Sequence, residues 1–254
     1  MMNTNLSLKG KTVLITGATG GIGDAIVAVT AAAGASLYLN GTNEEKLQRL
    51  SARLEEQGVV HQTHAANLLD SGAAEALVDA CVEDMGQIDV LINCIGINRP
   101  QPAEEVTEEN WDAVLDINLK ALFFVCQAAG RKMIPRRSGK IINISSQTGT
   151  VAIPLRAAYC ASKAGVDQLT RLLALEWAKH NITVNAVAPT FIKTEMTEKM
   201  FQDPEFKSYV LDSIPLGRMA TPEEIAYPVL FLSTEYANMI TGHVLLIDGG
   251  WTIH

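Results

Sequence analysis

Three polar side chains between residues 146 and 163 have the chemistry to move a proton and polarise a carbonyl group. Tyr159 and Lys163 lie four residues apart in "YCASK", so on a helix they point the same way. A free tyrosine has a pKa of about 10, and a nearby ammonium group lowers it by favouring the phenolate. Ser146, thirteen residues before Tyr159, would hold or polarise the reacting oxygen. The same spacing occurs on solvated helix faces, so the pair alone leaves both interpretations open.

A glycine-rich stretch, "TGATGGIG" at 16–23, has the composition of a phosphate-binding turn. Gly17, Gly21 and Gly23 allow a sharp turn and a close approach of a pyrophosphate, whose charge the N–H groups of a following helix would face. The spacing differs from G-x-G-x-x-G, so a glycine turn without a ligand is the alternative. Its position directly after an apolar run favours a dinucleotide site.

The elements that must position these groups alternate regularly along the chain. We predict strands at 12–16, 36–40, 59–65, 89–93, 140–145, 183–187 and 243–247. We predict helices at 22–33, 44–57, 71–85, 107–133, 157–179 and 222–233. Because parallel neighbours need crossover connections, this order predicts an α/β fold. The expected architecture is a single Rossmann-type domain over residues 1–254, a doubly wound parallel sheet of about seven strands with helices on both faces.

One connection is longer than the rest. Residues 190–220 exceed a plain strand-to-helix link and leave the carboxyl end of a strand, where such folds bind ligands. We therefore predict that this segment covers the substrate. A surface excursion with its own small helix is the alternative.

Composition narrows the classes of partner. The chain has 48% hydrophobic and 19% charged residues, as ordinary globular proteins do, and a formal net charge of −8. That charge opposes contact with nucleic acid or an anionic membrane and favours a small-molecule substrate. The start "MMNTNLSLKG" lacks the apolar core of a secretory signal, so we expect a cytoplasmic protein. The spacing of Cys81, Cys94, Cys126 and Cys160 fits neither a disulfide framework nor a metal site, so no metal is predicted.

The end of the second predicted strand reads "LNGTN", where this fold selects between NAD and NADP. Gly41 offers no carboxylate for a ribose hydroxyl, and Thr42 offers no positive charge for a 2′-phosphate. The missing carboxylate removes repulsion against a 2′-phosphate, to which Thr42, Asn40 and Asn43 can donate hydrogen bonds. The stretch favours NADP and leaves NAD open.

Taken together, the motifs resemble those of the short-chain dehydrogenase/reductase family over essentially the full length. They are "TGATGGIG", "NCIG" (93–96), "DINLKALFF", Ser146, "YCASK", "NAVAPTFIKT" and "DGG" (248–250). The resemblance implies an oxidoreductase that interconverts a secondary alcohol and a ketone, with catalytic residues Asn118, Ser146, Tyr159 and Lys163. In such enzymes Asn118 would hold a water linked to Lys163, and Lys163 would bind the nicotinamide ribose. The cofactor-binding residues it implies are Gly17, Thr19, Gly21, Ile22, Gly23, Thr42, Asn67, Leu68, Asn93, Gly96, Tyr159, Lys163, Pro189, Ile192 and Thr194.

Three positions depart from the family pattern. "NCIG" replaces "NNAG", Asn67 replaces an aspartate that commonly contacts adenine, and Thr190 replaces the glycine after Pro189. None of these changes removes a catalytic group. Asn67 can still pair with an adenine edge through its amide, and Thr190 reshapes the pocket by restricting the backbone.

The substrate class rests on a finer resemblance. "GINRPQPAEEVTEENWDAVLDINLK" and "DGGW" look most like enzymes of polyols and sugar acids, such as gluconate 5-dehydrogenases. We expect the substrate to contact Asn98, Arg99, Ser146, Gln147, Tyr159, Thr190 and Phe191. Arg99 would hold a carboxylate, although an exposed arginine is an equal alternative. Phe191 and Met196 suit an acyl chain equally well.

Two other functions remain as alternatives. "NITVNAVAPTFIKTEMTEKM" resembles 3-oxoacyl-carrier-protein reductases, which hold their acidic carrier with two basic residues; Arg137 matches the first, and His180 stands at the second. A non-catalytic nucleotide-binding regulator is the third interpretation, but such chains typically lose the tyrosine or the lysine.

We also expect a homotetramer. The predicted helices 107–133 and 157–179 carry more apolar surface than one sheet face can cover, and family members commonly pair these helices. The residues concerned are Leu122, Phe123, Phe124, Leu169, Leu172, Leu173 and Trp177.

Overall fold

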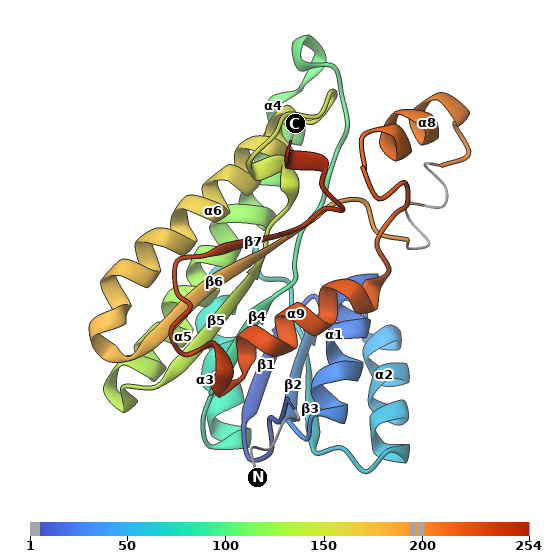
Figure 1. The fold of residues 1–254 in the computed structure, drawn as a ribbon. Helices are drawn as coiled ribbons and strands as arrows, with labels where there is room; N and C mark the ends of the chain where they lie inside the picture. The colour runs from blue at the N-terminus through green and yellow to red at the C-terminus, as the bar shows by residue number, and fades with distance from the viewer. Residues whose placement is uncertain (1–5, 194–196, 198–200, 254) are drawn as a thin grey trace.

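The computed structural model describes residues 6–193, 197 and 201–253, and one parallel sheet of seven strands runs through them (Figure 1). The strands are β1 (Thr12–Thr16), β2 (Ser36–Gly41), β3 (His61–Ala65), β4 (Val90–Asn93), β5 (Gly139–Ile144), β6 (Ile182–Pro189) and β7 (Val244–Ile247). Their order across the sheet is β3-β2-β1-β4-β5-β6-β7. The strand order reverses between β1 and β4, which places the ligand crevice at the carboxyl ends of these strands. The predicted doubly wound fold is confirmed.

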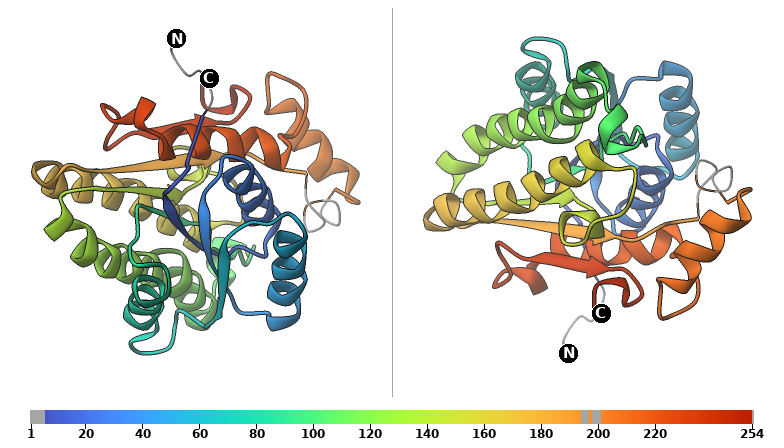
Figure 2. Two further views of the ribbon diagram at one scale, coloured as in Figure 1. Left: turned by 90° about the horizontal axis from the view of Figure 1, so that it is seen from below. Right: turned by 90° about the horizontal axis from the view of Figure 1, so that it is seen from above.

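Helices cover both faces of the sheet (Figure 2). One layer contains α1 (Gly21–Ala32), α2 (Glu44–Glu56) and α9 (Pro222–Ser233). The other contains α3 (Ala73–Met85), α5 (Leu122–Arg136) and α6 (Ala157–Trp177). Successive strand residues supply the two layers in turn: Val13 and Ile15 pack in the first core, and Leu14 packs in the second. Both cores are needed because a parallel sheet is buried on each side.

The predicted helix 107–133 is one continuous helix made of three parts. α4 (Glu108–Leu115) leads into a π-helical segment, Asp116–Ala121, and then into α5. Within the described chain this helix has the length and apolarity that a membrane span requires, but half of its most apolar window is buried inside the protein. Its inner side packs in the second core, so it serves as a core helix.

The long segment 190–220 carries a helix of its own, α8 (Pro204–Asp212), which begins at the side-chain cap of Asp203. Val210 of α8 packs with Ile153, Ile214 and Trp251 in a third, smaller hydrophobic cluster. This cluster lies apart from the two cores that cover the sheet. Met196 falls outside the described residues.

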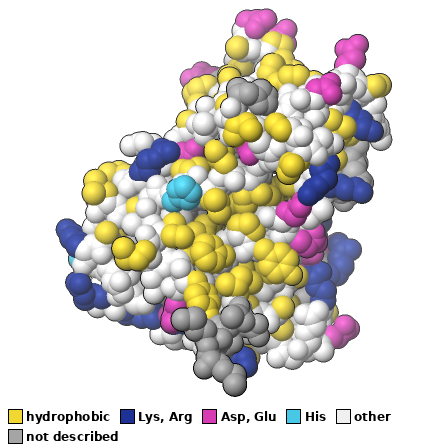
Figure 3. Space-filling model, in the orientation of Figure 1, with side chains coloured by type: hydrophobic (Ala, Val, Ile, Leu, Met, Phe, Trp, Pro, Cys, Tyr) yellow, Lys and Arg dark blue, Asp and Glu magenta, His cyan; other side chains and the backbone are white. Residues whose placement is uncertain are grey.

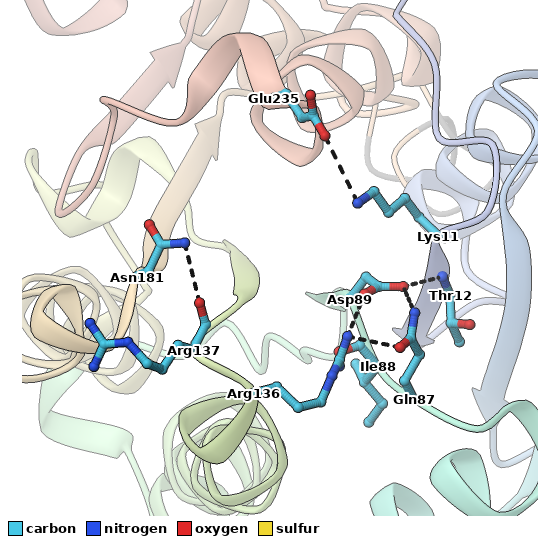
Figure 4. A network of polar contacts seen from close by, with 9 residues as sticks. All are labelled: Lys11, Thr12, Gln87, Ile88, Asp89, Arg136, Arg137, Asn181 and Glu235. Atoms are coloured by element: carbon cyan, nitrogen blue, oxygen red, sulfur yellow. Dashed lines mark hydrogen bonds and ion pairs between the residues drawn. The ribbon is translucent and has the colours of Figure 1, made fainter.

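A polar network fixes the opposite, amino-terminal edge of the sheet (Figure 4). Asp89 accepts hydrogen bonds from the Thr12 backbone N–H and from Gln87 Nε2, both at 2.9 Å. Its other oxygen accepts from Arg136 Nη2, also at 2.9 Å. One nearly buried carboxylate thus joins the starts of β1 and β4 to the end of α5, and these partners satisfy the charge that is buried with it.

Candidate active site

A chain of side-chain hydrogen bonds crosses the carboxyl ends of the three central strands. Thr16 on β1, Asn93 on β4 and Asn143 on β5 are neighbours in the strand register. Thr16 Oγ1 donates to Asn93 Oδ1 at 3.3 Å, and Asn93 Nδ2 donates to Asn143 Oδ1 at 3.0 Å. Asn143 Nδ2 then donates to Thr170 Oγ1 on α6 at 3.0 Å. Asn93 is fully buried, so it acts here by holding strands and helix together.

The glycine-rich turn has no room for side chains. Gly17 has φ +67°, and a Cβ there would lie 2.6 Å from the carbonyl oxygen of Cys94. A Cβ on Gly23 would collide with the oxygen of Gly17. Gly20, at the N-cap of α1, provides no side-chain cap, so the first N–H groups of the helix are available to a ligand. This tight cradle at a helix start fits the pyrophosphate of a dinucleotide.

The end of β2 lies directly against that turn. A Cβ on Gly41 would come within 3.2 Å of Thr19 Oγ1, and Thr42 beside it is exposed. The expectation that Asn40 donates to a 2′-phosphate is wrong in this structure. Asn40 is buried, and its amide donates to the carbonyl oxygens of His64 and Ala66 at 3.1 and 3.2 Å. Asn43 caps α2 with its side-chain oxygen, which accepts from the Lys46 N–H.

Sequence reasoning missed a basic pocket next to Thr19. A cavity of about 210 Å³ is lined by Thr19, Asp24, Lys46, Arg49, Leu50 and Arg53. Arg53 pairs with Asp24, and Arg49 lies 3.8 Å from Glu45. Lys46, in the first turn of α2, adds a cation beside the end of β2. Three basic residues at helical spacing directly after a strand were the signal available in the sequence.

The remaining predicted cofactor residues are distributed along the same edge of the sheet. Asn67 is exposed and forms local hydrogen bonds, donating to Asp70 and accepting from the Leu69 N–H. Leu68 and Ile192 are buried, and Pro189 ends β6. Thr194 lies outside the described residues.

The predicted catalytic groups converge where β5 ends and α6 begins. Lys163 is buried, and its Nζ donates to the carbonyl oxygen of Ile144 at 2.8 Å. The same nitrogen lies 5.7 Å from the ring centroid of Tyr159. The side chain of Ser146, just past β5, is hydrogen-bonded to that of Tyr159. A strand end and a helix start therefore bring a hydroxyl, a phenol and an ammonium group together.

The electrostatics of this cluster differ from the simple expectation. Burial raises the pKa of Tyr159, and the hydrogen bond with Ser146 and the charge of Arg156 only partly offset that rise. The expected lowering of this pKa by Lys163 is therefore wrong for this structure. Burial lowers the pKa of Lys163 itself to about 8, and its ammonium group is bound to Ile144 rather than to the phenol.

Asn118 lies in the π-helical segment and holds the loop that follows β4. Its Oδ1 accepts from the Ile97 N–H at 2.8 Å, and its Nδ2 donates to the Ile97 oxygen at 2.9 Å and to Ser162 Oγ at 3.0 Å. A Cβ on Gly96 would lie 3.3 Å from Asn118 Oδ1 and 3.5 Å from Lys163 Nζ. Gly96 therefore leaves just enough room for the amide and the ammonium group to face the same space.

Asp167 is a supporting residue that sequence reasoning missed. It lies one turn after Lys163, is buried, and accepts from Ser145 Oγ at 2.5 Å. A Cβ on Gly149 would collide with Asp167 Oδ2, so the loop that carries Ser146 packs directly on this carboxylate. The repeat of four residues from Tyr159 through Lys163 to Asp167 was the available signal.

The Cys94 thiol beside the site is unreactive. Burial raises the pKa of Cys94 to about 12, so the sulfur stays protonated at neutral pH. Within the described ranges, no group of three or more His, Cys, Asp or Glu side chains could hold a metal ion. The absence of a metal from the reaction stays a prediction.

Several predicted substrate residues carry orphan oxygens, which are buried side-chain oxygens without a hydrogen-bond partner. Buried side-chain polar atoms normally have a hydrogen-bond partner. Among the described residues, the exceptions are Asn98 Oδ1, Gln147 Oε1, Thr148 Oγ1, Thr183 Oγ1 and Thr190 Oγ1. Asn98, Gln147 and Thr190 follow β4, β5 and β6, at the edge of the sheet that carries Ser146. Three unsatisfied oxygens at one edge suit a ligand with several hydroxyl groups.

The other two substrate candidates have clear surroundings. Arg99 is exposed, and its Nη1 donates to Asn110 Oδ1 at 2.6 Å, so it lies at the rim. Phe191 packs against Phe201, Phe206 and Trp251, with ring centroids 5.6 to 6.3 Å apart. It therefore joins the segment 190–220 to the third hydrophobic cluster.

Comparison with known proteins gives consistent relatives. A family described as enoyl-(acyl carrier protein) reductase matches residues 17–252. A D-threitol dehydrogenase of Mycolicibacterium smegmatis is 40% identical over 97% of this chain and 94% of its own length. A 3-oxoacyl-[acyl-carrier-protein] reductase of Thermotoga maritima is 41% identical over 98% of this chain and 100% of its own.

A solved structure extends the likeness to three dimensions. A gluconate 5-dehydrogenase from Burkholderia cenocepacia, in complex with NADP and tartrate, superposes with a TM-score of 0.94. It is 33% identical, and the match covers 98% of both chains.

Proposed function

Because the chain belongs to the short-chain dehydrogenase/reductase family, we propose that it transfers a hydride between a nicotinamide dinucleotide and a secondary alcohol carbon of a polyol or sugar acid. The observation that carries this substrate class is the set of orphan oxygens on Asn98, Gln147 and Thr190. A polyhydroxy substrate satisfies such oxygens, whereas an acyl chain leaves them unpaired. The relatives named for threitol and gluconate point the same way.

The proposed catalytic roles follow from the positions of the side chains. The nicotinamide ring, when bound, supplies the hydride acceptor or donor. Ser146 holds the substrate oxygen, and Tyr159 takes the hydroxyl proton as the carbon loses its hydride, or returns it in the reverse reaction. Lys163 binds the nicotinamide ribose, and this role is supported by its place beside Tyr159, with Nζ 5.7 Å from the ring centroid. Asn118 positions the loop of Ile97 and faces the ammonium group across Gly96.

NADP(H) is the preferred cofactor in this proposal. No carboxylate stands at Gly41 or Thr42, and Lys46 lines the pocket that begins at Thr19. A cation near the end of β2 favours a 2′-phosphate. NAD(H) lacks that phosphate and gains nothing from the cation.

Residues 190–220 are proposed to cover the substrate in a single-domain enzyme. Support comes from Phe191 and Phe206, which pack beside the start of α6 and against each other. This contact brings the long segment next to the helix that carries Tyr159.

A carrier-protein reductase is the second candidate. One observation favours it. Arg137 is exposed, and its backbone oxygen accepts a hydrogen bond from Asn181 Nδ2 at 3.2 Å. Because His180 precedes Asn181, Arg137 and His180 lie together at the starts of β5 and β6. An acidic carrier could bind such a pair. The orphan oxygens do not favour an acyl substrate.

A cofactor-linked absorbance screen tests the two candidates. Purified protein is assayed with NADP(H) and NAD(H), in both directions, against polyols, sugar acids and an acetoacetyl thioester. We expect turnover of a polyol or sugar acid. Reduction of the thioester with no activity on any polyol or sugar acid would refute the proposal in favour of the carrier-protein reductase.

We also infer a cytoplasmic homotetramer. Of the predicted interface residues, Phe124 and Leu172 are 46% exposed, while Leu122 and Leu173 are buried within the protomer. Trp177 is likewise engaged internally, because it packs onto Gly130 of α5. A second apolar surface, which the sequence analysis did not identify, lies over α9 and β7 (Figure 3). Its exposed members are Tyr227, Tyr236, Met239 and Leu246. Two separate apolar faces suit an assembly with two kinds of contact.

A further inference from the structure

Arg156 is a buried cation next to the candidate active site that the proposed reaction leaves without a role. It is the residue before α6, three positions before Tyr159, and only 5% of its surface is exposed. Its Nη1 donates to the carbonyl oxygen of Pro154 at 2.9 Å. Within the part of the chain that the structure describes, no Asp or Glu pairs with it. Buried charges are normally paired, so this guanidinium points to a missing anion.

Two aromatic rings hold the guanidinium in place. Its central carbon lies 5.5 Å from the ring centroid of Phe191 and 5.4 Å from that of Phe206. Both rings belong to the segment 190–220. Cation–π contacts orient a guanidinium plane, but they do not neutralise its charge. Because Nη1 already donates to Pro154, the Nε and Nη2 side of the planar fork is left for a bidentate partner.

The backbone of Leu155 is strained, and this conformation turns the side chain of the neighbouring Arg156 inward. Leu155 has φ +65°, a conformation that a branched residue adopts rarely, and its side chain is 50% exposed. Its carbonyl oxygen accepts from the Gln101 N–H at 2.9 Å, which fixes the turn. The chain therefore exposes a leucine and buries the adjacent arginine, against the ordinary preference of both. Such strain persists mainly at functional sites.

Arg156 is also better placed than Arg99 to meet a substrate anion. Its positive charge acts on the Tyr159 phenol and lowers the pKa of that group, and it lies three residues before Tyr159 at the start of the same helix. Arg99, by contrast, is exposed at the rim and already bonded to Asn110.

We propose that Arg156 binds the carboxylate of the substrate, which makes the enzyme selective for sugar acids over neutral polyols. The proposal rests on the proposed function and assigns the end group of its substrate. An arginine binds a carboxylate through two parallel charge-assisted hydrogen bonds. A terminal CH₂OH group offers neither the charge nor the paired acceptors, so it leaves the guanidinium unpaired.

Tartrate and threitol provide a matched pair of probes. Both have four carbons and two central hydroxyl groups, but tartrate ends in carboxylates where threitol ends in alcohols. Binding of each is measured by calorimetry to the protein saturated with NADPH, which cannot accept a hydride, so neither alcohol is oxidised during the titration. We expect wild type to bind tartrate at least about tenfold more tightly than threitol, as charge-assisted hydrogen bonds predict.

The variants separate the charge from the packing. Arg156→Met should weaken tartrate binding by about thirtyfold and leave threitol binding within about threefold of wild type. The tartrate affinity of Arg156→Lys should fall between those of wild type and Arg156→Met. Phe206→Leu keeps the cation and loses one ring, so it should retain most of the tartrate affinity. Equal loss of tartrate and threitol binding in Arg156→Met would mean that the arginine only holds the fold of the site, and would overturn the proposal.

Two further outcomes would also overturn it. Tartrate binding that falls in Arg99→Met but not in Arg156→Met would assign the carboxylate to the rim arginine. Tartrate binding that tightens by about tenfold in the double variant Glu195→Gln, Glu198→Gln would show that an internal carboxylate is the partner of Arg156.

The absorbance screen keeps this proposal separate from the proposed function. Turnover of threitol or another polyol, with no tartrate binding, would overturn the role of Arg156 and leave the polyol reaction standing. Tartrate binding that depends on Arg156, with turnover of the thioester alone, would support the anion site and refute the proposed reaction.

Discussion

Lys163 Nζ donates to the carbonyl oxygen of Ile144 at 2.8 Å, so the ammonium group is anchored to the end of β5. The contact explains how a lysine remains inside the protein next to a tyrosine without an ion pair. It also sets the direction of the group, since the backbone of β5 is fixed by pairing with β4 and β6. The same strand end carries Ser146, so one backbone segment positions both partners of Tyr159.

Loss of the Tyr159 hydroxyl should abolish turnover and spare the fold. Tyr159→Phe removes the proton-transfer group, which contributes about 10²- to 10⁴-fold to such reactions. We expect kcat to fall by at least about 10²-fold, while cofactor affinity and melting temperature stay close to wild type. Enzyme assays and a fluorescence titration with NADPH measure both. Activity above a few per cent of wild type would contradict the role of Tyr159.

The pH dependence of the two directions should differ. Alcohol oxidation needs a deprotonated Tyr159, and burial raises the pKa of that phenol, so the oxidation rate should climb as pH rises above about 7. Ketone reduction needs the protonated form, which the raised pKa of Tyr159 preserves over the same range, so its rate should stay nearly constant there. Because the charge of Arg156 lowers the pKa of Tyr159, Arg156→Met should move the oxidation limb to higher pH. Rates of oxidation that are flat between about pH 7 and 10 would contradict this.

Burying Lys163 should cost stability at neutral pH. Its pKa is about 8 in the folded protein and 10.5 in the reference state, so between these values the unfolded chain binds more protons and stability rises with pH. The penalty is therefore fully present below about pH 8 and fades towards pH 10.5. Lys163→Met should gain melting temperature relative to wild type at neutral pH, and the gain should shrink as pH rises from about 8 towards 10.5. Thermal melts at several pH values measure it, and a gain that grows with pH would contradict the assignment.

Cofactor choice should reverse with one charge. NADPH should bind wild type more tightly than NADH, and Thr42→Asp should invert the order because a carboxylate repels the 2′-phosphate. Lys46→Met should weaken NADPH binding and leave NADH binding unchanged, because Lys46 lines the pocket beside Thr19. Titration of both cofactors tests this. A wild-type preference for NADH would refute the cofactor assignment and leave the catalytic residues unaffected.

The assembly should depend on the exposed apolar residues. Light scattering of wild type should give about four times the protomer mass of 27.4 kDa. Leu175→Glu, on the 80% exposed position of α6, should reduce that mass without loss of helix content, because a buried unpaired charge opposes association. Lys179→Glu changes charge near the same helix end and serves as the comparison. A wild-type mass near 27.4 kDa at micromolar concentration would contradict the tetramer.

Local patterns in the sequence were sufficient to predict the strands of the sheet and the reacting side chains. The strand at 12–16 and the helix at 222–233 have the predicted bounds, because apolar period and caps are local properties. Tyr159 and Lys163 share one helix face for the same reason. The helix 107–133 was predicted as one unit, but the wide turn that places Asn118 inside was not, because a π-helical segment leaves no mark in the apolar period.

Only the tertiary structure decided which polar groups already have hydrogen-bond partners within the protein. Asn40 was expected to face a phosphate, yet β3 and the chain after it take both of its donors, and such pairing between strands cannot be read from either strand alone. Burial likewise reversed the expected direction of the Tyr159 pKa, since desolvation depends on everything packed around the phenol. The predicted helix 157–179 begins just after Arg156, so the sequence pattern assigned this residue no role. Its burial against Phe191 and Phe206 arises only when a segment far along the chain folds over it.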